Sequence, residues 1–574
     1  PWLMLKIAGQ KKITHEHAEN GGKIGRFYRK LVTPVIASRR SSWLFLIIVG
    51  IVTALSVSLF ATKTVRVKLL PFDNKAEMQI VLDLPEGAAL EDTERSLFAL
   101  AESIRELEEI DNIQAYAGTS APMNFNGLVR HYFLRQSPEL GDLQINLVEK
   151  GDRKRTSHEI ALDIRERIKS VPLLEGANVK VVEVPPGPPV ISTLLAEIYG
   201  PDAQTRRAVA KQIKTLFHEA DFIVDVDDSI GDPRPRLAVS IDAPSAADYG
   251  VMQQDILDTI AISFRGQVIG TSPRGEARDP LDIRVEFPRS EQIWSQKMAT
   301  IPVPRRLAGI TSDPVELGAV VNVNNQQGSP IIFRRDGRFA DLVQGELAGK
   351  FEAPIYGMFE IQKRVDDVDW AALGLEKPVI RMAGQPENEQ QNTLLWDGEW
   401  EITYVTFRDM GIAFAIALIG IYILVVAQFG SFKIPLVILA PVPLTLIGIM
   451  FGHWIFGAPF TATSMIGFIA LAGIIVRNSI LLVDFVKHGQ TPDMPLKEVL
   501  IQAGSIRFKP ILLTALAAMI GAAVILSDPI FQGLAISLLF GLASSTALTV
   551  LVIPAIYVAL RGPDWRPKVE SENV

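Results

Sequence analysis

The stretch Thr463–Lys487 (TSMIGFIALAGIIVRNSILLVDFVK) constrains the fold of this chain most strongly. It is apolar, and it is longer than the about 20 residues with which a helix crosses a bilayer. It nevertheless carries Arg477 near its middle and Asp484 two turns later, on the same helix face. A charge facing hydrocarbon costs roughly 2.5–3.5 kcal/mol, so Arg477 should face protein or water. The small residues Gly467 and Gly473 permit close helix packing. The sequence therefore predicts a charged site inside a bundle of membrane helices.

Two interpretations of these charges stay open. Either Arg477 and Asp484 act in function, or they are packing contacts that reach toward one membrane surface. Ionisable residues within membrane helices commonly mark ion or proton pathways, which favours a functional role for Arg477. Asp484 lies nearer the cytoplasmic end, and there neither interpretation is preferred.

Composition separates the chain from several classes of protein. Of its 574 residues, 48% are hydrophobic and 21% are charged, which indicates membrane spans joined to a large soluble part. A net charge of −7 gives no sign of nucleic-acid binding. The absence of cysteine excludes disulfides, thiolate metal sites and cysteine nucleophiles. The sequence contains no phosphate-binding loop and no hydrolase or metalloprotease motif, so we expect neither an enzyme nor a cofactor.

The topology follows from the apolar and basic residues. Residues Lys23–Ser38 carry an apolar stripe that predicts an amphipathic helix lying on a membrane surface. The span Trp43–Ala61 follows, and the Lys and Arg before it place its start in the cytoplasm. Five more spans are predicted at Asp409–Gln428, Ile434–Phe456, Thr463–Lys487, Ile511–Leu526 and Gly533–Leu560. Lys and Arg gather in the loops assigned to the inside, so the chain should end in the cytoplasm. Because it opens on Pro1, we expect a fragment.

The region between the first two spans should lie outside the cytoplasm and alternate strands with helices. Its first part predicts the order β-α-β-β-α-β, at Met78–Leu84, Leu90–Glu108, Ile113–Ala117, Leu143–Val148, His158–Ile168 and Val179–Val184. This order is the split βαβ of ferredoxin-like domains. The proline-rich segment 185–189 predicts a stiff linker.

A second unit is predicted to begin with strand Leu194–Tyr199, helix Gln204–Glu219 and strand Ile223–Asp227. An insertion then interrupts it. The insertion should hold strands Leu237–Ile241 and Ile283–Phe287 and a helix at Gln253–Phe264. Residues 330–400 show no clear pattern.

Several motifs together resemble a known family. They are Leu69-Leu70-Pro71, Leu84-Pro85-Glu86-Gly87, Gly473–Phe485, Arg507–Thr514 and the Ser545–Tyr557 pattern near the end. The chain resembles the C-terminal half of a resistance-nodulation-division (RND) efflux permease, of the AcrB-like type that exports hydrophobic and amphiphilic compounds. Pro1-Trp2-Leu3 resembles the end of the sixth helix of such a permease.

The resemblance implies an α/β membrane protein in a bacterial inner membrane. Its six-helix bundle (one plus five) would carry a large periplasmic loop with two ferredoxin-like porter subdomains and an inserted docking subdomain. The implied boundaries are 1–42 for the preceding helix end and amphipathic helix, 43–62 for a transmembrane helix, 63–185 for the first porter subdomain, 190–235 with 330–405 for the second, 236–329 for the docking subdomain, 409–560 for five transmembrane helices and 561–574 for a cytoplasmic tail.

The resemblance also implies a proton-driven multidrug exporter. It would work as a homotrimer with a periplasmic adaptor (membrane fusion protein) and an outer-membrane channel. Its proton relay would include Arg477, Asn478, Asp484, Arg507 and Thr514, while the aspartate pair that takes up protons belongs to the half that this chain lacks. Such exporters most often carry lysine in place of Arg477. Arginine effectively never loses its proton, so Arg477 would act as an electrostatic latch and not as a proton carrier.

Some relay residues have simpler interpretations. The hydroxyl of Thr514 either bonds across helices or returns to the backbone of its own helix. Arg507 lies where its span meets the cytoplasm, and the positive-inside rule alone accounts for it.

The segment Pro122–Leu134 supplies a candidate substrate pocket in Phe125, Tyr132 and Phe133, because aromatic rings beside a few polar groups suit amphiphilic ligands. The alternative is a turn and strand with core aromatics. No metal site is predicted: His15 and His17 lie in a polar segment, and the methionines are scattered.

Two other functions stay open. One is a related RND permease for metals or lipids. The other is a non-transporting fragment of a split or truncated permease gene. A membrane-anchored sensor fits less well, because sensing requires no charge within a six-helix bundle.

Overall fold

The computed structural model describes residues 22–184, 187–231, 235–273, 280–305, 313–349 and 351–567. Pro1-Trp2-Leu3, His15 and His17, the first two prolines of the linker and the end of the tail lie outside these ranges. The chain divides into two compact units. The first consists of Pro1–Ile230 with Ile332–Val574, and the second of Gly231–Ile331.

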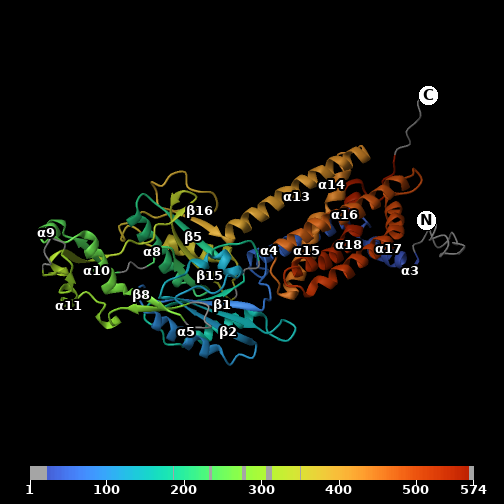
Figure 1. The fold of residues 1–574 in the computed structure, drawn as a ribbon. Helices are drawn as coiled ribbons and strands as arrows, with labels where there is room; N and C mark the ends of the chain where they lie inside the picture. The colour runs from blue at the N-terminus through green and yellow to red at the C-terminus, as the bar shows by residue number, and fades with distance from the viewer. Residues whose placement is uncertain are drawn as a thin grey trace. The chain divides into compact units, whose positions relative to one another are not determined.

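Among the described residues, six helices are long and apolar enough to cross a membrane. They are α4 (Arg39–Ala61), α13 (Glu399–Phe429), α14 with α15 (Ile434–Leu439 and Pro441–Phe456), α16 (Ala462–Gly489), α17 (Leu496–Ala523, prolonged by the 3-10 turn η4, Val524–Ser527) and α18 (Gln532–Arg561). Figure 1 shows α15 to α18 in orange to red, and α18 packs against α15, α16 and α17. The predicted apolar helices are confirmed.

The largest differences from the predicted bounds concern three of these helices. Helix α13 begins at Glu399 and so includes a polar turn before its apolar part. The predicted helix over 434–456 is divided at Ala440, because Pro441 has no N–H to continue the hydrogen-bond ladder. Helix α17 begins at Leu496 and continues through Pro510, whereas the predicted span begins only at Ile511. Neighbouring helices hold the broken turn, so the proline does not end the helix.

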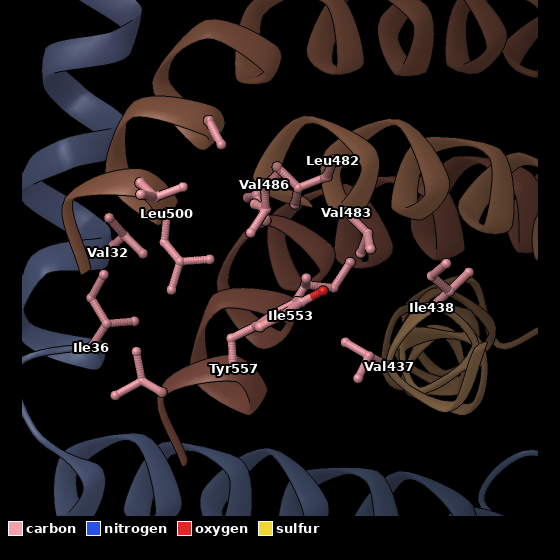
Figure 2. Packing of buried hydrophobic residues seen from close by; sticks show 14 of the residues in the cluster. Val32, Ile36, Val437, Ile438, Leu482, Val483, Val486, Leu500, Ile553 and Tyr557 are labelled. Atoms are coloured by element: carbon pink, nitrogen blue, oxygen red, sulfur yellow. The ribbon is translucent and has the colours of Figure 1, made fainter. Parts of the chain in front are cut away.

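Helix α3 (Gly22–Val35) divides its apolar stripe between two surroundings. Tyr28 and Val32 are fully buried, whereas Phe27 and Leu31 are exposed. Figure 2 shows Val32 and the adjoining Ile36 on the side of Leu500 of α17 and Tyr557 of α18, within one apolar cluster. The expectation that the whole stripe faces a membrane surface is therefore wrong for its inner part, which packs on helices.

The first sheet has the predicted ferredoxin-like order. Its elements are β1 (Glu77–Asp83), α5 (Leu90–Ile104), β2 (Ile110–Ala117), β3 (Leu140–Leu147), α7 (Ser157–Ile168) and β4 (Asn178–Glu183). The strands are antiparallel in the order β2-β3-β1-β4, which confirms the split βαβ. Helix α5 stops before the predicted Glu108, because the chain turns after Ile104 and buries Leu107 in the core.

The second sheet repeats this order around the insertion. It uses β5 (Leu194–Tyr199), α8 (Ala203–His218), β6 (Ile223–Asp228), β15 (Asp341–Leu347), α12 (Pro354–Asp367) and β17 (Thr393–Gly398). The strand order is β16-β17-β5-β15-β6, and the extra strand β16 (Val379–Arg381) lies parallel to β17. The segment 330–400, which showed no pattern, thus supplies three of the six elements.

The second unit is inserted between β6 and β15. It holds β7 (Pro235–Ile241) paired with β12 (Val321–Gln327), the pair β8 (Gln267–Ser272) and β9 (Leu281–Val285), and the helices α9 (Ala243–Asp248), α10 (Gln253–Arg265) and α11 (Gln296–Ala299). Its own apolar core includes Val251, Ile256 and Leu317. This unit also contains the short elements β10 (Pro302–Val303), β11 (Val315–Glu316), η2 (Arg289–Glu291) and η3 (Leu317–Ala319). The short strands β13 (Arg334–Arg335) and β14 (Arg338–Phe339) pair with each other in the first unit.

Candidate functional site

The predicted relay residues of α16 differ in exposure. Asn478 is buried, Asp484 is half-buried and Arg477 is exposed in this chain. The carboxylate of Asp484 lies 3.3 Å from Nδ1 of His488. Within the described part of the chain Arg477 makes no ion pair or hydrogen bond, so it does not pair with Asp484 on the face that they share. Arg477 is therefore exposed without an ion pair in this chain, and the expectation that it faces protein or water stays a prediction.

On α17 the two candidates lie on either side of Pro510. The guanidinium carbon of Arg507 lies 5.1 Å from the centroid of the Phe485 ring of α16, and its Nε is buried without a hydrogen-bond partner. Thr514 is exposed, and its Oγ1 donates to the carbonyl oxygen of Pro510 at 2.9 Å. Of the two interpretations of Thr514, the structure has the bond to its own helix. No hydrogen bond among the described residues joins Arg477, Arg507 and Thr514.

The three predicted pocket aromatics lie on two short elements. Phe125 opens the short helix α6 (Phe125–Val129) and is exposed, whereas Tyr132 and Phe133 belong to the 3-10 turn η1 (Tyr132–Leu134). The ring of Phe133 lies 5.9 Å from that of His131, and the ring of Tyr132 lies 5.7 Å from the guanidinium of Arg135. The aromatic pocket stays a prediction.

A cavity that sequence reasoning missed lies beside the two ferredoxin-like sheets. Its volume is about 240 Å³. Its lining comes from the segment that follows α4, from α7, from the start of α12 and from two turns between apolar helices. The residues are Arg66, Lys68, Pro71, Phe72, Asp73, Asn74, Thr156, His158, Glu352, Ala353, Tyr356, Pro459 and Pro529.

His158 connects the two sheets across this cavity. It lies in the first turn of α7, where Thr156 and Glu159 form a capping box. Its Nδ1 is 2.8 Å from Oε2 of Glu183 on β4, and its Nε2 is 3.0 Å from Oε1 of Glu352, just before α12. Burial alone would lower the pKa of His158, but hydrogen bonds to the two carboxylates outweigh it and raise that pKa to about 9. His158 is therefore an imidazolium at neutral pH.

Lys68 brings the segment after α4 to the same place. Its Nζ lies 3.6 Å from Oε2 of Glu352 and 3.6 Å from the centroid of the Phe72 ring, which itself stacks on His158 at 4.2 Å. Burial lowers the pKa of Lys68, and Glu399, Glu352 and Glu183 oppose this. Glu399 is the first residue of α13. The buried ammonium of Lys68, in the segment after α4, thus interacts with the first residue of α13. These are the two apolar helices before and after the ferredoxin-like folds.

More charge pairs join the two sheets beside a smaller cavity of about 40 Å³. Arg130 contacts Glu346 of β15 at 2.7 Å, and Arg165 contacts Asp225 of β6 at 2.7 Å. Lys180 of β4 bridges Asp83 of β1 and Asp227 of β6. The two ferredoxin-like folds therefore contact each other through several ion pairs.

The described residues contain no group of three or more His, Asp or Glu that could hold a metal ion. Of the methionines in this part, Met78 is buried in the first ferredoxin-like core and Met358 in the second, where the partly buried Met382 also packs. Met298 is buried in the second unit, whereas Met123 and Met252 are exposed.

Six apolar helices with two ferredoxin-like folds between the first and second define a membrane permease of the RND class. The chain belongs to the AcrB/AcrD/AcrF family, whose model matches residues 4–368 and 376–561.

Relatives and a solved structure agree with this assignment. The chain is 23% identical over 549 residues to the swarming motility protein SwrC of Bacillus subtilis (strain 168), which covers 94% of this chain and 47% of SwrC. It is 24% identical over 433 residues to the cobalt-zinc-cadmium resistance protein CzcA of Cupriavidus metallidurans, covering 73% of this chain and 39% of CzcA. A crystal structure of a heavy metal efflux pump matches with a TM-score of 0.74 at 20% identity, over 93% of this chain and 52% of that chain. The chain thus spans about half the length of the proteins that it matches, and the last likeness shows the fold alone.

Proposed function

We propose that this chain is the C-terminal half of a proton-driven RND efflux permease of the bacterial inner membrane. The match of the family model to nearly the whole chain carries the proposal, together with coverage of about half of each relative. The topology of one plus five spans, with the two ferredoxin-like folds as porter subdomains and the inserted unit as a docking subdomain, belongs to the same proposal. So do the homotrimer, the periplasmic adaptor and the outer-membrane channel.

The cargo that we propose is a heavy-metal cation. Our expectation from sequence was a hydrophobic or amphiphilic drug, with a metal permease as the alternative. The names of CzcA and of the solved pump favour that alternative. Since the described residues offer no three-ligand group, this half would supply motion and proton coupling, and the metal ligands would lie elsewhere in the permease.

The exposed surface that carries Arg477 and Thr514, called the relay face here, supports proton coupling. Arg477 and Thr514 are polar residues of apolar helices, and both are exposed in this chain. An unpaired guanidinium facing hydrocarbon is costly, so a partner should cover this face. We propose that the other half of the permease covers it with carboxylates, which Arg477 answers when they lose their protons.

Cargo and coupling can be tested together in cells that lack the native, full-length permease and are supplied with it again. We expect it to restore resistance to cobalt, zinc or cadmium salts, and Arg477→Ala to abolish that resistance at normal membrane abundance. The matched control is Arg105→Ala, which removes an exposed guanidinium paired with Glu102 on α5. Resistance to dyes or detergents without resistance to metals would support the multidrug function instead. Restored resistance to neither class would favour a non-transporting fragment.

A further inference from the structure

A proline in α18 leaves one carbonyl group without its helical donor. Pro554 lies inside the helix and has no N–H, so it cannot donate to the carbonyl oxygen of Val550, four residues earlier. Tyr28 of α3 fills this position, because its hydroxyl donates to that oxygen at 3.0 Å. Tyr28 is fully buried. A side chain from the amphipathic helix thus completes the hydrogen bonding of a broken turn in α18.

The ring of Tyr28 also fits a notch in α17. A Cβ atom added at Gly504 would collide with Oη, Cζ and Cε1 of Tyr28, so only glycine leaves room for the ring. Phe508, one turn further along α17, lies 5.6 Å from the Tyr28 ring between centroids. The ring is therefore held between α17 and α18.

Helix α17 runs through Pro510, which lies in its interior. The missing N–H weakens the ladder at that turn, which separates the segment before it from the segment that carries Thr514. The earlier segment holds Gly504, Phe508 and Arg507, and the guanidinium of Arg507 lies over the Phe485 ring of α16. Tyr28 thus contacts the segment of α17 on which Arg507 lies.

We propose that Tyr28 is a positioning residue: it fixes the segment of α17 before Pro510 against α18, and so keeps Arg507 in place at Phe485. This rests on the proposed function, in which Arg507 belongs to the proton relay. Phe27 and Leu31 on the outer side of α3 are exposed, so a displacement of α3 at the membrane surface would reach Arg507 through Tyr28.

The first test measures how often α3 leaves its place. Val32 is buried one turn after Tyr28, and Val32→Cys introduces the only thiol of this chain. In the full-length permease, with any other cysteine replaced, we expect Tyr28→Phe to increase the labelling rate of the thiol at position 32 about fivefold, the factor that corresponds to one lost hydrogen bond. Tyr422→Phe is the matched control. Its hydroxyl also donates to a backbone oxygen at 3.0 Å, that of Phe432, but in an exposed position.

A second variant tests the notch. Gly504→Ala should increase the labelling rate by about tenfold or more, because the added methyl group displaces the ring. Gly521→Ala on the same helix should leave the rate unchanged, since its Cβ would meet nothing within 4 Å. Labelling rates that stay at the wild-type value in both Tyr28→Phe and Gly504→Ala would overturn the proposal.

The export rate distinguishes a positioning role of Tyr28 from a merely structural role. We expect Tyr28→Phe to lower the maximal export rate severalfold at an unchanged KM for the metal, because the cargo does not meet Tyr28. Faster labelling with an unchanged export rate would overturn the positioning role. A wild-type permease that exports nothing would overturn the proposed function, and with it the link to Arg507, while the labelling rates would still show whether Tyr28 holds α3.

Discussion

His158 and Glu352 are 194 residues apart in the sequence, and Nε2 of the one lies 3.0 Å from Oε1 of the other. The same imidazole contacts Glu183 through Nδ1, so a single ring joins α7 and β4 of the first sheet to the segment before α12 of the second. The contact lies where Lys68 and Glu399 bring the ends of two apolar helices to the soluble part. His158 is thus placed to hold the two ferredoxin-like folds closed.

The closed arrangement should weaken in alkali. The pKa of His158 is raised from 6.5 to about 9, so its stabilising contribution is complete below pH 6.5 and is lost as the pH rises through 9. The contribution is up to about 3 kcal/mol. We expect the melting temperature of the full-length permease in detergent to fall between pH 6.5 and 9, and His158→Gln to flatten that fall. His218→Gln is the control, because burial and Lys214 lower the pKa of His218. An unchanged alkaline fall in His158→Gln would contradict this role.

Glu352 should contribute more to the free energy of unfolding than an exposed carboxylate does. Burial alone would raise its pKa, but His158 and Lys68 lower it, so its contribution is present above pH 4.5 and is lost as the pH falls below that value. Glu352→Gln leaves Lys68 buried beside a neutral group, and we expect a loss of about 2–3 kcal/mol in the free energy of unfolding. Glu102→Gln, in an exposed pair with Arg105, should cost no more than about 0.5 kcal/mol. Denaturant titration of both variants gives the comparison, and equal losses would show that the buried cluster has no special weight.

Glycines permit the close packing of α15 on α18, and Gly448 makes the closest approach. A Cβ atom at Gly448 would collide with the carbonyl oxygen of Phe540 and with Oγ of Ser544. Gly448→Ala should therefore force the helices apart and cost about 3 kcal/mol, seen as lower membrane abundance and melting temperature. Gly411→Ala on α13 adds its methyl group to open space and should be neutral. A Gly448→Ala variant as stable as Gly411→Ala would mean that the two helices can move apart freely.

The proposed topology can be read with thiol reagents, because the chain has no cysteine. Single cysteines in place of Glu86 and Lys150 should react with a membrane-impermeant reagent in intact cells from which the outer membrane is permeabilised. A cysteine in place of Lys497 should react only after the inner membrane is opened. The reversed pattern would overturn the topology.

Local patterns in the sequence predicted the helices and the first sheet well. Long apolar runs identify α4, α16 and α18, since a membrane helix must be apolar along its length. Alternation and helical spacing over 78–184 were enough for a ferredoxin-like fold. The second copy was harder to read, because its last three elements are separated from the first three by the inserted unit.

Contacts distant in the sequence could not be predicted. Nothing near His158 indicates that Glu352 faces it, and nothing near Tyr28 indicates that Pro554 frees a carbonyl for its hydroxyl. The start of α17 was predicted too late, at Ile511, because a proline commonly ends a helix. The helix nevertheless runs through Pro510, because neighbouring helices support the broken turn. The candidate relay residues lie on α16 and α17, within the helices expected to carry them, and their part in a proton relay stays a prediction.

We propose that Arg477 couples proton flow to export, and transport by the reconstituted, native full-length permease is the test of this role. In liposomes loaded with a fluorescent zinc or cobalt indicator, an imposed pH gradient should drive metal movement by the wild type. Arg477→Lys, which keeps a cation, should retain part of this transport, whereas Arg477→Ala should lose it. Metal movement by Arg477→Ala at the wild-type rate under the same gradient would contradict the account.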